Sequence, residues 1–81
     1  MKLGRVSGSV WATKKSPALA GQILLRVHTG DSELIAADLV GAGEGDTVLV
    51  LLGTAARQES GAAVDAAIVA ILDDTEASHV S

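Results

Sequence analysis

The stretch IAADLVGAGEGDTVLVLLGTAAR (35–57) contains the pattern that decides the fold. Its middle, GAGEGD (41–46), is rich in glycine and predicts a loop. The segment TVLVLL (47–52) follows directly and predicts a strand that is apolar on both faces. A strand of a small barrel needs an apolar inner face only. The outer face of this strand therefore has to be covered by something else.

The flanking sequence predicts four more strands, either from alternation of apolar and polar residues or, in AAIVAIL, from a continuous apolar run. The predicted ranges are 3–11, 22–28, 33–40 and 66–72. In the second strand Ile23, Leu25 and Val27 are expected to share one face, and in the third strand Ile35, Ala37 and Leu39 are expected to do so.

The segment GTAARQ (53–58) predicts one or two helical turns, with Thr54 as the N-cap and a turn at 59–61. These elements together predict an all-β fold: a small five-stranded OB-like β-barrel (the shape of oligonucleotide-binding domains) with one short helix. A five-stranded sandwich is the main alternative. We expect residues 1–74 to form the single barrel domain and residues 75–81 to form a short polar C-terminal tail.

The composition of the chain favours self-association. The 81 residues are 48% hydrophobic, with Trp11 as the single aromatic residue and no cysteine. A domain of this size buries only about 60–65% of its unfolded surface, and no disulfide can stabilise it. Surplus aliphatic surface is most simply buried between subunits, so an oligomer is predicted.

Charge and hydropathy argue against nucleic-acid and membrane partners. The net charge is −4, and one aromatic residue offers little platform for stacking bases. The longest apolar run, 66–72, is far shorter than the roughly 20 residues that span a bilayer. The N-terminus does not resemble a signal peptide, so a cytoplasmic location is expected.

No catalytic, cofactor-binding or metal-binding residue is predicted. His28 and His79 lack the further ligands that a zinc site requires. GAGEG (41–45) lacks the Lys-Ser/Thr pair of a phosphate-binding loop, so its glycines are interpreted as turn residues. Asp38 and Asp65 are expected to bond to nearby backbone.

The remaining polar positions are weaker candidates. The neighbouring Asp73 and Asp74 diverge on a strand end, which does not suit paired acid–base chemistry. Lys14 and Lys15 form the one local basic pair, either as a solvated loop or as a contact with a partner. Arg57 lies beside the two most apolar strands, where its guanidinium could bind oxygen atoms across an interface.

Three segments, taken in order, resemble the pentameric vertex proteins of bacterial microcompartment shells, the family of the ethanolamine-utilisation and carboxysome vertex proteins. They are GRVSGSVWATKKSPALAGQILLRV (4–27), the stretch 35–57 and VDAAIVAILD (64–73). The resemblance covers residues 1–74. Departures from the common pattern are Gln22 for a frequent Lys, Thr54 for Ser and Ala63 for Pro, with a shorter tail than the carboxysomal relatives have.

The resemblance implies a cyclic homopentamer that caps five-fold vertices among hexameric facet shell proteins, without catalysis. The alternative function is a small OB-like module that binds nucleic acid or peptide. We expect subunit contacts through Leu49 and Leu51, or through Val48 and Val50 on the opposite face. Further residues expected near a junction or the central axis are Gly41, Ala42, Gly43, Gly53, Thr54, Ala55, Ala56 and Arg57. Lys14 and Lys15 are the candidate contact with facet proteins.

Overall fold

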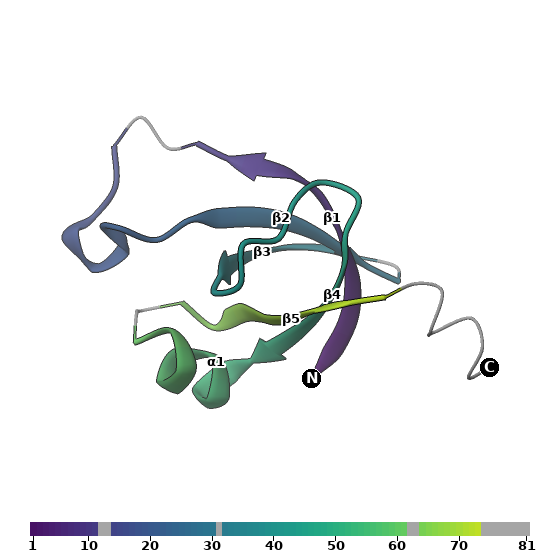
Figure 1. The fold of residues 1–81 in the computed structure, drawn as a ribbon. Coiled ribbons are helices and arrows are strands. Elements are labelled where there is room, and N and C mark those ends of the chain that lie inside the picture. The colour runs from purple at the N-terminus through teal and green to yellow at the C-terminus, as the bar shows by residue number, and fades with distance from the viewer. Residues whose placement is uncertain (12–13, 31, 62–63, 74–81) are drawn as a thin grey trace.

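The structure is a computed structural model that describes residues 1–11, 14–30, 32–61 and 64–73. Its elements wrap around a central axis as a barrel (Figure 1). In chain order they are β1 (Lys2–Val10), the 3-10 helix η1 (Pro17–Leu19), β2 (Leu24–Thr29), β3 (Ser32–Asp38), β4 (Thr47–Leu52), α1 (Gly53–Ser60) and β5 (Ala66–Leu72). The predictions made for Ala63, Asp74, His79 and the tail lie outside the described residues.

The five strands close in the order β1-β2-β3-β5-β4. Neighbouring strands are antiparallel, except that β3 and β5 run parallel. Helix α1 connects β4 to β5 and packs against both strands. The predicted barrel with one short helix is confirmed, and the sandwich alternative is not found.

The interior of the barrel is filled by small and branched aliphatic side chains. The central cluster consists of Val6, Leu25, Val27, Ala36, Val48, Val50, Ala66 and Ile68. All of these side chains are almost completely buried. A core of this kind explains why the chain folds without Phe or Tyr, since a narrow five-stranded barrel leaves little room for aromatic rings.

The face of the third strand that carries Ile35, Ala37 and Leu39 is not the one that points into the central cluster. Ala36 lies in the core and Leu34 packs against it, whereas Ile35 is largely exposed on the outer surface. Alternation favours the outer face because Asp38 shares the inner face, and Ala36 and Ala37 are both fully buried. Ile23 is also exposed, because β2 begins one residue after it.

Helix α1 differs from its prediction at both ends. It continues to Ser60 and is ended by Gly61, whose φ of 65° is the left-handed conformation typical of a helix C-terminus. The N-cap is Leu52, without a side-chain cap, and not Thr54. The Thr54 hydroxyl lies within the first turn and accepts a hydrogen bond from Arg57 Nη2 at 3.3 Å.

Candidate functional site: surfaces for assembly

The outer surface of the barrel over β1, β4 and β5 carries a row of apolar side chains. Leu3 pairs with Leu49, and Leu49 pairs with Ala70, which places the three side chains in one row across the three strands. Leu3 is 57% exposed, and Leu49 and Ala70 are half-buried. We call this row the apolar wall. The apolar wall exposes aliphatic side chains to solvent, which is typical of a surface that contacts another protein.

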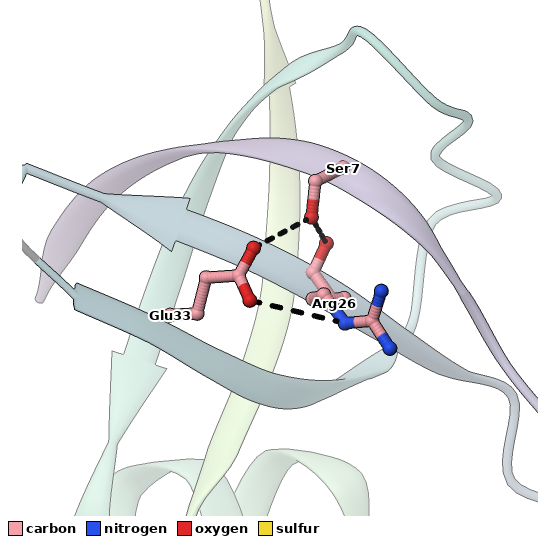
Figure 2. A network of polar contacts seen from close by, with 3 residues as sticks. All are labelled: Ser7, Arg26 and Glu33. Carbon is pink, nitrogen blue, oxygen red and sulfur yellow. Dashed lines mark hydrogen bonds and ion pairs between the residues drawn. The ribbon is translucent and has the colours of Figure 1, made fainter.

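The outer surface over β1, β2 and β3 has the opposite character. Figure 2 shows Ser7, Arg26 and Glu33 converging there. Ser7 Oγ lies 3.3 Å from the Arg26 carbonyl oxygen and 3.4 Å from Glu33 Oε2, and Arg26 Nε lies 3.9 Å from Glu33 Oε1. These side chains are solvated, so their pairing contributes little to stability. The contrast makes the apolar wall the better surface for a neighbouring subunit.

Strand β4 carries, on its two opposite faces, the two sets of residues that the sequence offers as alternatives for subunit contacts. Val48 and Val50 have no exposed surface and belong to the central cluster. Leu49 and Leu51 are half-buried and alternate with them, so they face outward. Of the two alternatives, only Leu49 and Leu51 offer side-chain surface to a second copy.

The loop after β3 closes one end of the barrel. Ala42 packs against the central cluster, whereas Gly41 and Gly43 are exposed. The Asp38 carboxylate accepts hydrogen bonds from the backbone N–H groups of Val40, Gly41 and Ala42 at 3.0–3.2 Å. This confirms that Asp38 bonds to nearby backbone. Because a carboxylate of the chain itself occupies these amides, the glycine-rich loop does not offer them to a phosphate.

The predicted helical contacts fall into two groups. Ala56 is completely buried within the protomer, so its side chain has no surface left for a neighbour. Gly53 is half-buried, and Thr54, Ala55 and Arg57 are exposed. The exposed members lie together on α1, next to the ends of β4 and β5.

The two lysines differ in their surroundings. Lys15 Nζ donates a hydrogen bond to the Gln22 carbonyl oxygen at 3.1 Å, which ties the loop back to the start of β2. Lys14 is exposed. A groove of about 410 Å³ lies beside Lys15, and apolar residues such as Trp11 and Ile23 line it together with polar ones such as Gln22. Trp11 is 91% exposed.

Two features of the site were missed by sequence reasoning. Leu3 and Ala70 lie beside Leu49 because of strand pairing, and no local sequence pattern predicts that pairing. Asp46 accepts the Gly43 N–H at 2.8 Å and so fixes the loop from its far end. The spacing D-x7-D around the glycine-rich loop (38–46) could have indicated this second carboxylate.

The described residues contain no cluster of side chains that could hold a metal ion. Among the helices in the described ranges, none has the length and hydropathy needed to cross a bilayer.

A closed barrel with an apolar outer wall is typical of a small protein built for self-association. The family model described as "Ethanolamine utilisation protein EutN/carboxysome" matches residues 1–73. The chain belongs to the EutN/CcmL family of microcompartment shell vertex proteins.

Individual relatives match over nearly the whole chain. The shell vertex protein GrpN of Rhodospirillum rubrum is 41% identical over 86 residues, covering 94% of this chain and 97% of the relative. The vertex protein PduN of Salmonella typhimurium is 44% identical over 87 residues, covering 90% and 96%.

Solved structures show the same fold. A pentameric microcompartment shell protein, GrpN from Rhodospirillum rubrum, superimposes with a TM-score of 0.81 at 41% identity and covers 90% of this chain and 94% of its own. CcmL of Nostoc sp. superimposes with a TM-score of 0.82 at 40% identity, covering 90% and 89%. These comparisons support a shell protein over the alternative of an OB-like binding module.

Proposed function

We propose that this protein is a structural shell subunit, five copies of which form a ring that caps a five-fold vertex of a bacterial microcompartment. The observation that carries the proposal is the match to the pentameric shell protein GrpN over 90% of the chain. The apolar wall supplies a physical reason for assembly, because a ring buries aliphatic surface that the isolated barrel exposes.

The proposed mechanism is geometric. In a ring, one patch of each subunit meets a different patch of the next, and the rotation closes after five copies. A five-fold ring inserted among hexameric facet proteins introduces the curvature that closes a flat layer. The protein performs no catalysis in this account, and it acts in the cytoplasm as part of the shell.

Co-assembly with facet proteins tests this function. We expect co-expression with hexameric shell proteins from the same source to yield closed polyhedral particles in electron micrographs. The same hexameric proteins alone should give open sheets or tubes. Closed particles of equal number and shape with and without this chain would contradict the proposed role.

Replacing Leu51 with aspartate should abolish assembly. Leu51 is half-buried on the outer face of β4, opposite the buried Ala67, so a carboxylate there would lose solvent without gaining a partner. Such burial costs several kcal/mol. Light scattering of the purified variant should give the mass of a monomer, and an unchanged pentamer would refute the assignment of this face.

Replacing both Lys14 and Lys15 with glutamate should leave the ring intact and weaken its contact with facet proteins. Both side chains are exposed, and Lys15 is held by a single hydrogen bond to a carbonyl. The measurement is co-sedimentation of the variant with preformed facet sheets, with the mass of the free variant as control. Undiminished co-sedimentation would remove these lysines from the facet contact.

A further inference from the structure

The segment LVGAG (39–43) carries no polar side chain, although it lies on the surface of the protomer. Leu39 and Val40 are 39% and 42% exposed. Surface loops usually carry polar side chains that compete well for water. An exposed loop made only of aliphatic residues and glycine is therefore unusual.

The backbone N–H groups of this segment are all paired within the protomer. Leu39 N–H donates to the Ile68 carbonyl oxygen at 3.2 Å. The next three N–H groups, those of residues 40–42, donate to the carboxylate of Asp38. Gly43 N–H donates to Asp46 Oδ2 at 2.8 Å. Every backbone N–H from residue 39 to residue 43 therefore has a partner within the protomer.

The far end of the loop is anchored to the barrel wall. Val6 N–H donates to the Asp46 carbonyl oxygen at 3.0 Å, and Gly45 N–H donates to the Val6 carbonyl oxygen at 2.8 Å. Asp38 itself is the last residue of β3. Both carboxylates thus project from positions fixed by the sheet, and they set the conformation of the segment between them.

Complete internal pairing has a specific consequence for binding. A buried N–H without a partner costs roughly 1–3 kcal/mol, so a loop with free amides resists burial in a dry contact. Segment 39–43 can enter such a contact without leaving any N–H unpaired. In contact with water alone, the amides would not need these carboxylates, because water would satisfy them.

We propose that Asp38 and Asp46 are positioning residues for self-assembly, which preset segment 39–43 for burial against a neighbouring copy of this chain. The inference rests on the proposed pentameric function and goes beyond it by assigning a role to the two aspartates. Preorganisation of this kind strengthens association, because the loop loses less freedom when the contact forms.

A second copy is the partner that the comparison with relatives favours, and the lack of charge on segment 39–43 suits it. Each chain carries a net charge of −4, so two copies repel one another through charged surfaces. Segment 39–43 lacks charge, and contact through it avoids that repulsion. The pentameric relative of the same fold is the reason to choose self-association over another partner.

Two substitutions test the proposal. Asp38→Asn should raise the dissociation constant of the ring about tenfold or more, because the amide nitrogen of asparagine would face an N–H donor in place of the second carboxylate oxygen. Val40→Lys should prevent ring formation by placing a charge in the contact. Ile23→Lys is the matched control, since Ile23 is exposed but lies outside the segment, and it should form the normal ring.

Hydrogen exchange distinguishes a positioning role of Asp38 in the loop from a general role in the stability of the barrel. In the Val40→Lys monomer, the amides of residues 40–43 should still exchange slowly, because the carboxylates hold them without a neighbour. Adding Asp38→Asn should speed exchange at residues 40–42 about tenfold or more, while β-strand amides such as that of Val50 keep their protection. Uniform loss of protection across the barrel would mean a general structural role and would overturn the proposal.

The proposed function and this inference fail in different ways. A monomeric wild-type chain would overturn the proposed function. A pentameric wild type together with a pentameric Val40→Lys variant would overturn the assembly role of the segment alone. Rapid exchange of residues 40–43 in the dissociated wild-type fold would also overturn it, because the loop would not be preset.

Discussion

Replacing Leu49 with aspartate should convert the ring into folded monomers. Leu49 is the centre of the apolar wall, between Leu3 and Ala70, and its side chain points away from the core. A carboxylate at this place would be desolvated in each subunit contact, at a cost of about 3 kcal/mol per contact. Since about 1.4 kcal/mol is a factor of ten in the dissociation constant, this cost weakens association at each junction more than a hundredfold.

Sedimentation velocity at micromolar concentration would measure the mass of the Leu49→Asp variant, and circular dichroism would check its strands. Ile35→Asp is the control, because Ile35 is also an exposed aliphatic residue on a strand, but it lies opposite Arg26 on the polar side of the barrel. We expect this control to remain pentameric. A Leu49→Asp variant that still forms rings would exclude the apolar wall from the subunit contact.

Replacing Gly4 with alanine should destabilise the barrel strongly. Gly4 is buried in β1, where a Cβ atom would lie 2.5 Å from Val27 Cγ1 and 2.9 Å from Thr29 Cγ2. Both neighbours belong to β2 and are themselves buried, so relief requires the strands to move apart. Overpacking of this kind costs about 3 kcal/mol, a large share of the roughly 5–15 kcal/mol that holds a domain folded.

Thermal unfolding at one fixed protein concentration would measure this effect, because assembly makes Tm depend on concentration. A loss of about 3 kcal/mol should lower Tm by roughly 12 °C or more in a chain of this size. Gly8→Ala is the matched control in the same strand, since its Cβ would meet no atom within 4 Å. Equal Tm values for the two variants would show that β1 and β2 adapt to a side chain at Gly4.

The most apolar elements of the fold could be predicted from the sequence. The bounds of β4 and β5 match the predicted ranges 47–52 and 66–72, because a continuous aliphatic run ends abruptly at glycine or aspartate. The phase of β3 could not be predicted, because the set Ile35, Ala37 and Leu39 is more apolar than the set Leu34, Ala36 and Asp38 that faces the core. The missing cap at Thr54 reflects a helix that starts directly at the end of a strand.

The candidate site was predictable only in part. Leu49 and Leu51 could be proposed as contact residues because an apolar outer face on β4 needs a cover, and the structure places both on that outer face. Leu3 and Ala70 depend on the register of three strands that are distant in the sequence, and such pairing is set by the whole barrel. Asp38 was correctly assigned to backbone hydrogen bonding, but its partnership with Asp46 requires the path of the loop across the barrel end.

The central claim is that this barrel is a subunit of a five-membered ring. Native mass spectrometry of the purified protein tests it most directly, because the chain has a mass of 8.1 kDa and each added copy is resolved. The account predicts a dominant species of five chains, about 40 kDa, at micromolar concentration. A stable monomer, or a ring of any other number of chains, would contradict it.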